Sequence, residues 1–261
     1  MNTKQQDYIS VGDLQIYYEV VGNPDGIPIV FHHGLGNCVQ DWYDLGYVEV
    51  LKDRYKLVLI DSLGFGRSSK PHQPEYYKEN LLMDYSIAVM RHLEIEPGEA
   101  IFFGNSMGGR LGYMFMAYHP QWFKAFIIGG MHPYGATDIG FQLLPWLEKG
   151  MDYFVEQLDQ LDPMPAATRG RYLQNDNQAI LACYANYNDR EDLFIQFNQR
   201  KIDKPILLYA GENDNGIIER MMEAKTQLEQ NGEQVTLTIL KDLSHCQTYW
   251  NGNQSAQLMQ E

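Results

Sequence analysis

The segment 104–109, with the sequence Gly-Asn-Ser-Met-Gly-Gly, constrains the fold of this chain more than any other stretch. It follows an apolar run at 100–103 that is typical of a buried strand, and it precedes a longer apolar run at 111–118 that is typical of a buried helix. The glycines two positions to either side of Ser106 are needed because a Cβ there would collide with the neighbouring strand or helix. The segment therefore predicts a sharp strand-to-helix turn that holds the Ser106 hydroxyl at one end of a sheet.

The rest of the chain shows an antiparallel start followed by alternating strands and helices. A hairpin is expected around Gly12-Asp13, and apolar runs then recur at the spacing of β-α units. This order predicts an α/β protein with a mostly parallel, eight-stranded sheet covered by helices on both faces. The expected strands are 8–11, 14–20, 27–31, 55–60, 100–103, 125–128, 206–209 and 235–240. The expected helices are 39–51, 76–92, 106–118 and 217–230, with a closing helix in the tail.

The interval 135–200 interrupts this alternation, because it contains no strand-like run and is rich in aromatic residues. We expect a helical cap here, inserted into a core formed by 1–134 and 201–261. Its position favours a cap, since connections at the carboxyl ends of parallel strands surround the ligand crevice. Helices that only pack on the core are the alternative. The candidate substrate contacts in this interval, each of which could instead pack the cap on the core, are Phe141, Trp146, Tyr184 and Phe194.

Composition narrows the class of protein further. The 261 residues are 44% hydrophobic, which suits one large domain, yet no apolar run reaches the roughly 18 residues that a membrane span needs. The first seven residues are polar and lack the apolar core of a signal peptide, so a cytoplasmic location is expected. The 3 cysteines are far apart and form no Cys-x-x-Cys pair, which argues against a disulfide framework and against a zinc site.

The charge balance restricts the partners of the protein. The chain carries 34 acidic and 20 basic residues, which gives a net charge of -14. A field of this sign disfavours binding to nucleic acids and to anionic membranes. We therefore expect a small-molecule substrate as the partner, and the composition leaves monomer and homodimer open.

Four further segments accompany the 104–109 turn, and each follows an expected strand. They are His33-Gly34, the segment 61–68 (Asp-Ser-Leu-Gly-Phe-Gly-Arg-Ser), Gly211-Glu212-Asn213-Asp214 and Leu243-Ser244-His245. In this order the segments resemble the α/β-hydrolase superfamily over essentially the whole chain. The Asp-x-x-Gly-x-Gly-x-Ser pattern of 61–68 is typical of its single-domain, cap-bearing members. The resemblance implies the α/β-hydrolase fold and a nucleophile elbow at Ser106.

The chemistry of a serine nucleophile then selects its partners. A serine hydroxyl attacks a carbonyl only beside a base, and histidine suits that role because its ordinary pKa lies near neutrality. The histidine needs a carboxylate to hold its tautomer. Only His245 of the 7 histidines follows the last strand, where the superfamily places its base, and the order Ser106, Asp214, His245 matches the superfamily. Glu212 and Asp242 are reserve acids, and Asp214 could instead cap the following helix.

An oxyanion formed by attack of Ser106 needs two hydrogen-bond donors. The backbone N–H of Met107 is one, because it lies at the start of the expected helix and points toward the oxyanion position. The resemblance assigns the other donor to Leu35, the residue after His33-Gly34. We expect structural roles for His33, which would hold this loop, and for Arg67, which would form a buried ion pair.

These residues predict a serine hydrolase that cleaves a small carboxylic ester, thioester or lactone through an acyl-enzyme on Ser106, without a metal or an organic cofactor. A carbon–carbon bond hydrolase of a dicarbonyl substrate is an alternative, because that group shares the Gly-Asn-Ser-Met-Gly-Gly elbow. It usually places Trp directly after the histidine, where this chain has Cys246. A ligand receptor without turnover is a third alternative on the same fold. Serine at the elbow argues against halide-displacing and epoxide-opening relatives, which use aspartate there.

Overall fold

The computed structural model describes residues 3–135, 138–186 and 189–258, and in these ranges all side chains except those of Thr3 and 138–142. Within the described ranges, no helix is both long and apolar enough to cross a bilayer.

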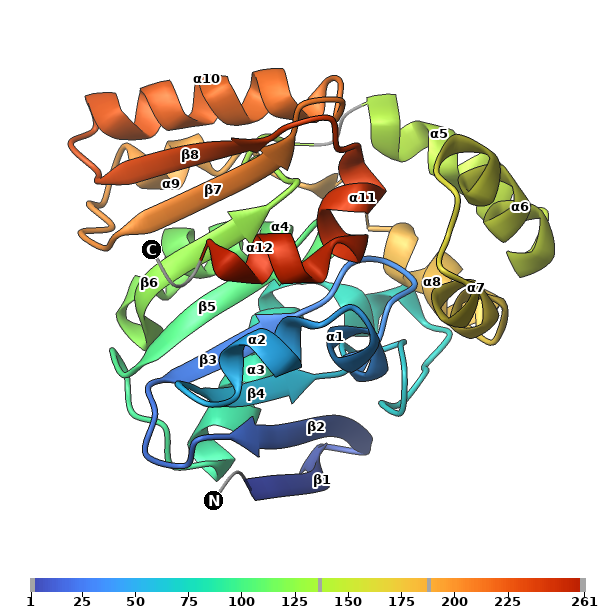
Figure 1. Ribbon diagram of the computed structural model, residues 1–261, viewed down its shortest axis with the longest axis horizontal. Helices are drawn as coiled ribbons and strands as arrows, with labels where there is room; N and C mark the ends of the chain where they lie inside the picture. Colours follow the sequence, from blue (N-terminus) through green and yellow to red (C-terminus); the bar gives the residue numbers. More distant parts are fainter. Residues whose placement is uncertain (1–2, 136–137, 187–188, 259–261) are drawn as a thin grey trace.

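One eight-stranded sheet forms the centre of the molecule, with the strand order β1-β2-β4-β3-β5-β6-β7-β8 (Figure 1). Strands β1 and β2 form the predicted hairpin, β2 also runs antiparallel to β4, and all other neighbours are parallel. The prediction of a mostly parallel, eight-stranded sheet is therefore confirmed. The strands are β1 (Thr3–Val11), β2 (Leu14–Gly22), β3 (Pro28–His32), β4 (Lys56–Ile60), β5 (Ala100–Asn105), β6 (Phe123–Gly129), β7 (Ile206–Gly211) and β8 (Val235–Leu240).

Helices cover both faces of this sheet (Figure 1). The first face carries α3 (Glu79–His92), α4 (Met107–Tyr118) and α10 (Ile217–Gln230). The second face carries α1 (Val39–Asp44), α2 (Tyr47–Leu51), α11 (His245–Trp250) and α12 (Gly252–Gln257). The molecule thus has the three-layer arrangement that alternating strands and helices predict.

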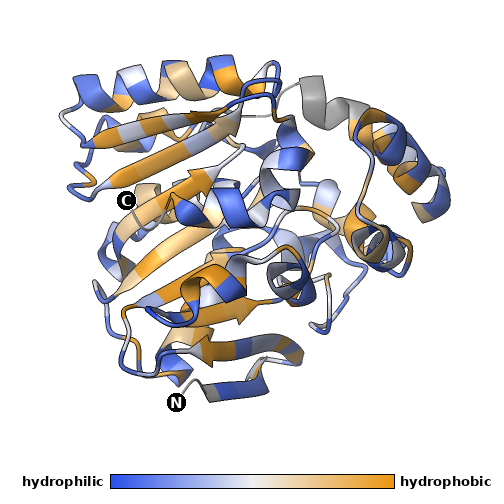
Figure 2. Cartoon of the chain, in the orientation of Figure 1, coloured by the Kyte–Doolittle hydropathy of each residue, from blue (hydrophilic) through white to orange (hydrophobic). Residues whose placement is uncertain are grey.

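Alternate strand residues enter two separate hydrophobic clusters, because successive side chains of a strand point to opposite faces of the sheet. In β3, Val30 packs toward the first face, while Ile29 and Phe31 pack toward the second. In β5, Phe102 and Phe103 divide in the same way. Strands buried on both faces read as continuous apolar runs, which are visible as orange ribbons in the middle of Figure 2.

A helical insertion separates β6 from β7. Its described helices are α5 (Asp138–Leu147), α6 (Met151–Leu161), α7 (Ala166–Leu173), α8 (Asn177–Tyr184) and α9 (Phe194–Phe197). Helices α5 to α8 lie beyond the carboxyl ends of the parallel strands (Figure 1) and pack around a third hydrophobic cluster that includes Phe154, Tyr172 and the core residue Phe65. Helix α9 packs against α4 instead, within the cluster on the first face.

Three of the predicted helices are interrupted. The predicted helix 39–51 is divided into α1 and α2 at Gly46, whose φ of 90° lies in the left-handed region, where an α-helix cannot continue. The predicted helix 76–92 starts as a 3-10 turn over Pro74–Tyr77, and Lys78 is extended with ψ 139° before α3 begins. The closing helix is likewise two short helices, α11 and α12.

Candidate active site

The carboxyl ends of four parallel strands bring the predicted site residues to one edge of the sheet. Leu35 follows β3, Ser106 follows β5, Asp214 follows β7 and His245 follows β8. These strands all run in the same direction. Their loops therefore meet at one edge, although they are far apart in the sequence.

Ser106 occupies a strained turn between β5 and α4. Its φ of 52° and ψ of -114° form a backbone conformation that costs about 1–3 kcal/mol for a residue with a side chain. A Cβ at Gly104 would lie 2.3 Å from the Gly108 carbonyl oxygen, and a Cβ at Gly108 would lie 2.1 Å from the His32 carbonyl oxygen. Only glycine fits at these two positions, so the glycines allow the strand, the turn and the helix to pack closely around Ser106.

Ser106, His245 and Asp214 form a continuous hydrogen-bonded chain. His245 Nε2 lies 3.0 Å from Ser106 Oγ, and His245 Nδ1 lies 2.8 Å from Asp214 Oδ2. The Asp214 side chain is buried, whereas the His245 side chain keeps 34% of its exposure. The carboxylate holds the imidazole hydrogen on Nδ1, which leaves Nε2 able to accept the proton of the Ser106 hydroxyl.

Opposing effects set the proton affinity of the His245 ring. Burial lowers the pKa of His245, while the Asp214 carboxylate raises it by charge and by its hydrogen bond. The carboxylate of Asp162, which directly follows α6, adds to the increase. The pKa of His245 consequently lies above its ordinary value, which means that the protonated ring is stabilised at this site.

The reserve acids occupy other positions. Glu212 accepts a hydrogen bond from the backbone N–H of Asp242 at 3.0 Å, in an exposed turn. Gly216 directly precedes α10, and its N–H donates to the Glu219 carboxylate at 2.6 Å. The Asp214 carboxylate is therefore the acid that contacts His245, and α10 is capped by Glu219 rather than by the Asp214 side chain.

The loop after β3 is held by His33. The His33 Nδ1–H donates to the Gly34 carbonyl at 2.8 Å, and His33 Nε2 accepts the Ser62 N–H at 3.0 Å. Burial lowers the pKa of His33, so the ring stays neutral in this one tautomer. The two hydrogen bonds fix the loop that carries Leu35.

The segment 61–68 closes around a buried carboxylate. Asp61 accepts hydrogen bonds from the backbone N–H of Val39 at 2.6 Å and of Arg67 at 2.8 Å. The Arg67 guanidinium lies 3.3 Å from Glu19, but its own side chain is 52% exposed. The prediction of a buried ion pair is therefore wrong for Arg67, because only the Glu19 side of the pair is buried and the Arg67 side chain is half exposed to solvent.

A cavity of about 80 Å³ adjoins Ser106 and His245. Most of its wall is apolar, and none of its described lining residues is an Asp, Glu, Lys or Arg. The core contributes Gly34, Leu35, Asn37, Asn105, Ser106, His245, Cys246, Tyr249 and Trp250 to the wall, and the insertion contributes Leu143, Phe154, Leu158 and Tyr172. Burial, with the nearby carboxylates, raises the pKa of the Cys246 thiol to about 12, so this thiol is protonated and a poor nucleophile.

Of the four aromatic residues predicted to contact the substrate, Trp146, Tyr184 and Phe194 lie away from this cavity. The side chain of Phe141 is outside the described part of the structure. Trp146 and Tyr184 pack in the third hydrophobic cluster, and Phe194 is buried in the cluster on the first face of the sheet. The 80 Å³ cavity is not lined by Trp146, Tyr184 or Phe194. Packing of helices on one another and on the core explains their positions.

Several residues at this site were not predicted from the sequence, among them Leu158, Trp250 and Asp162. Leu158 and Trp250 line the cavity, and Asp162 accepts a hydrogen bond from Ser244 Oγ at 2.6 Å beside His245. The amphipathic pattern of α6 could have marked Leu158 as an inward-facing residue. No local pattern marks Asp162, because its partner lies 82 residues away along the chain.

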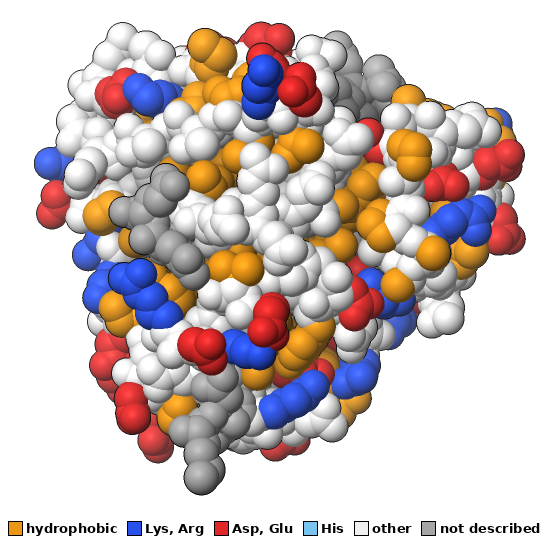
Figure 3. Space-filling model, viewed as in Figure 1, with side chains coloured by type: hydrophobic (Ala, Val, Ile, Leu, Met, Phe, Trp, Pro, Cys, Tyr) orange, Lys and Arg blue, Asp and Glu red, His pale blue; other side chains and the backbone are white. Residues whose placement is uncertain are grey.

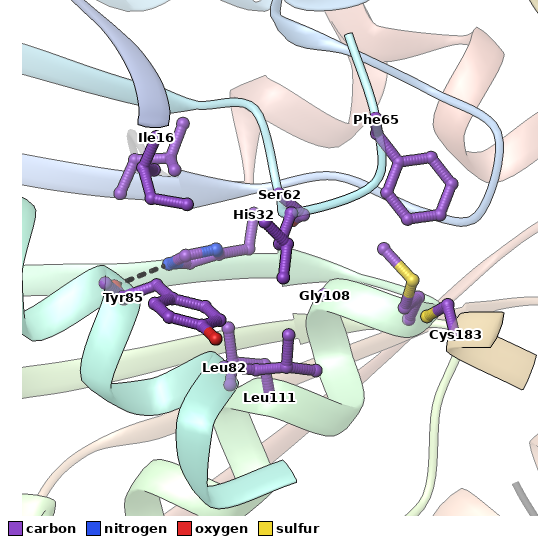
Figure 4. A pocket seen from close by; sticks show the side chains of 13 residues that line it. Ile16, His32, Ser62, Phe65, Leu82, Tyr85, Gly108, Leu111 and Cys183 are labelled. Atoms are coloured by element: carbon purple, nitrogen blue, oxygen red, sulfur yellow. Dashed lines mark hydrogen bonds between the residues drawn. The ribbon is translucent and has the colours of Figure 1, made fainter. Parts of the chain in front are cut away.

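A second cavity, of about 30 Å³, is lined by residues that include His32, Ser62 and Phe65 (Figure 4). Met107 and Gly108 line this second cavity, and most of its wall is apolar. His32 Nε2 is hydrogen-bonded to Ser86 Oγ at 2.9 Å, and burial lowers the pKa of His32 to about 3, which keeps its ring neutral. Residues at the start of α4 therefore line this smaller cavity, whereas Ser106 itself lines the first one.

Known proteins share parts of this sequence and its fold. Residues 27–162, just over half of the chain, match the family model for the alpha/beta hydrolase fold. The chain is 25% identical to the proline iminopeptidase of Neisseria gonorrhoeae over 211 residues, which cover 76% of this chain and 65% of that protein. The chain therefore spans less than two thirds of the length of this curated relative.

Two further similarities involve different chemistry. The chain is 31% identical to the 2-hydroxymuconate semialdehyde hydrolase of Pseudomonas sp. strain CF600 over 166 residues, which cover 62% of this chain and 54% of that protein. The enol-lactonase from Burkholderia xenovorans LB400 has a similar structure, with a TM-score of 0.79 over 97% of this chain and 98% of that one, at 20% sequence identity. The structural similarity concerns the fold alone.

Proposed function

Because the chain belongs to the alpha/beta hydrolase family, we propose that it is a serine hydrolase of small carboxylic esters, thioesters or lactones. The observation that carries this proposal is the hydrogen-bonded chain from Ser106 Oγ through His245 to Asp214. A serine hydroxyl at a strained turn, bonded to the free nitrogen of an oriented imidazole, is the arrangement that acyl transfer requires.

The proposed reaction has two halves. In the first, Ser106 Oγ attacks the substrate carbonyl, His245 Nε2 takes the hydroxyl proton, and the N–H groups of Leu35 and Met107 stabilise the tetrahedral oxyanion. His245 then gives the proton to the leaving group, and an acyl-enzyme remains on Ser106. In the second half, His245 takes a proton from water, the resulting hydroxide attacks the acyl carbon, and Ser106 recovers its proton as the acid leaves.

The size and polarity of the cavity support a small, neutral acyl group. Its volume of about 80 Å³ is well below the roughly 300–1,000 Å³ of a pocket for a drug-sized ligand. The absence of a carboxylate among its described lining residues gives no partner for the cationic amino end of a peptide. These features favour an ester, thioester or lactone over a peptide, the class of substrate suggested by the name of the proline iminopeptidase relative.

Carbon–carbon bond hydrolysis is the second candidate, and the 31% identity to a semialdehyde hydrolase favours it. The same Ser106, His245 and Asp214 arrangement would serve that reaction on a dicarbonyl substrate. Hydrolysis of short p-nitrophenyl esters does not separate the two candidates, because both kinds of enzyme can catalyse it. A vinylogous diketone substrate does, since only a carbon–carbon bond hydrolase turns it over efficiently.

The experiment that tests the proposal is labelling of the active serine followed by a substrate panel. A fluorophosphonate probe should attach one phosphonyl group per molecule of wild-type protein, on Ser106, and none to Ser106→Ala. The intact mass of each protein measures this labelling. The same substitution should lower kcat on short esters by about 10⁴-fold or more, because alanine keeps the turn and removes only the nucleophilic oxygen. The matched control is Ser10→Ala in the exposed hairpin, which should label and turn over like wild type.

Two outcomes would contradict the proposal. A Ser106→Ala variant that keeps a tenth of the wild-type activity would exclude an acyl-enzyme on this residue. A wild-type protein that labels at Ser106 but completes no more than one turnover on any ester, thioester or lactone would be a ligand receptor on the hydrolase fold.

A further inference from the structure

Helix α7 of the insertion binds directly to the loop that carries Leu35. The Tyr172 hydroxyl donates to the Leu35 carbonyl at 2.7 Å and lies 3.1 Å from Asn37 Oδ1. Asn175, two residues after α7 ends, donates through Nδ2 to the Gly36 carbonyl at 2.7 Å. The Tyr172 side chain is buried, with 6% of the residue exposed, and also lines the cavity beside Ser106.

These contacts fix three successive peptide planes. The carbonyl of Gly34 is held by His33, that of Leu35 by Tyr172 and that of Gly36 by Asn175. In a trans peptide the N–H points opposite to the carbonyl of the preceding residue, so each bond also fixes the direction of the next N–H. The Leu35 N–H belongs to the first of these planes, whose carbonyl His33 holds, and Tyr172 holds the plane that follows it. Leu35 is therefore held on both sides of its Cα, and two of the three hydrogen bonds come from the insertion.

The core loop and the insertion also fit each other sterically. A Cβ on Gly36 would lie 2.5 Å from the Tyr172 ring, and the φ of Gly36 is +79°. The neighbouring Arg171 pairs with the fully buried Asp41, at the start of α1, through its Nε at 3.0 Å. The absence of a side chain at Gly36 therefore leaves room for the Tyr172 ring beside the loop. The ion pair between Arg171 and Asp41 holds α7 against the core next to this contact.

We infer that Tyr172 is a positioning residue for the oxyanion hole: it holds the Leu35–Gly36 peptide, and so restricts rotation of the adjoining peptide that carries the Leu35 N–H toward the tetrahedral intermediate. This inference rests on the proposed function. The insertion then takes part in transition-state stabilisation as well as in covering the substrate. A donor displaced from the oxyanion loses most of its effect, because the field of a hydrogen bond falls steeply with distance and angle.

The test is Tyr172→Phe, which removes one oxygen and keeps the ring. With a short ester we expect kcat to fall about three- to tenfold, the value of one ordinary hydrogen bond, while KM stays within twofold. The affinity for a trifluoromethyl ketone, whose hemiketal oxygen occupies the oxyanion position, should fall by the same factor as kcat. Asn175→Ala should also lower kcat and the affinity for the ketone. This second variant replaces the first if the melting temperature of Tyr172→Phe is more than a few degrees below that of the wild type.

The matched control is Tyr153→Phe, a tyrosine of α6 whose hydroxyl makes none of these bonds to the loop; it should leave both quantities unchanged. Unchanged kcat and ketone affinity in a folded Tyr172→Phe would overturn the inference. So would a rise in KM alone, since that would make Tyr172 a substrate contact. Failure of the proposed function is distinguishable, because it would appear in the wild type as an unlabelled Ser106 and no ester turnover.

Discussion

At the residue scale, His245 gives the proposed reaction its pH dependence. The ring must be neutral to accept the Ser106 proton, and the Asp214 and Asp162 carboxylates raise the pKa of His245 despite its burial. Because the folded pKa is raised, the protonated and inactive form persists to a higher pH than it would for an ordinary histidine. We therefore expect kcat/KM to be lost as the pH falls through a value above about 6.5 and to be present at higher pH.

Asp162→Asn should shift this acidic limb to lower pH, since it removes one of the carboxylates that raise the pKa of His245. The measurement is the pH profile of kcat/KM on a neutral ester. The control is Asp152→Asn, an exposed acid of the same helix α6 that changes the net charge equally. A shift to higher pH, or equal shifts in both variants, would show that the local carboxylate does not act on His245.

At the element scale, we expect α6 to limit the length of the acyl group that the cavity accepts. Leu158 lies in the cavity wall on this helix, whereas Leu161, one turn later, is 69% exposed. Leu158→Ala should enlarge the cavity and raise kcat/KM for a hexanoate ester relative to an acetate ester by about tenfold, since each methylene that fits an apolar pocket contributes roughly 1–3 kcal/mol.

The matched control for this prediction is Leu161→Ala, which changes the same residue type on the same helix and should leave the chain-length preference unchanged. A stable Leu158→Ala variant with the wild-type ratio of hexanoate to acetate would mean that the acyl group does not enter this cavity.

At the scale of the whole molecule, the net charge of -14 acts on association with charged substrates. Acidic and basic side chains are interspersed over the face in Figure 3. Two basic residues that could steer anions are already paired, because Arg169 lies 3.3 Å from Asp159, and Arg171 binds both Asp41 and Asp44. The field of the whole protein is thus not reversed by these two cations.

We accordingly expect kcat/KM at low salt to be higher for a neutral ester than for a multiply anionic ester with the same acyl group. The difference should narrow as salt rises, because the screening length shortens from about 10 Å at 0.1 M to about 3 Å at 1 M. The measurement is kcat/KM for both esters across this salt range. An anionic ester that is favoured at low salt and loses its advantage at high salt would mean that a local basic cluster steers it.

The sequence alone determined the sheet, the turn at Ser106 and the chain order of Ser106, Asp214 and His245. These features are local, since an apolar run and the few residues after it decide how a strand ends. The sequence did not predict the break at Gly46, where one positive φ ends a helix although the helical pattern of residues continues past it.

Only the tertiary structure decided which side chains surround Ser106. Tyr172 meets Leu35 across 137 residues, and Asp162 meets Ser244 across 82, so neither pair has a local pattern that predicts it. The aromatic residues of the insertion look alike in the sequence, yet Tyr172 and Phe154 line the cavity while Phe194 is buried against the core. The physical reason is that a helix turns its side chains in all directions, and the packing of the insertion on the core determines which of them face the site.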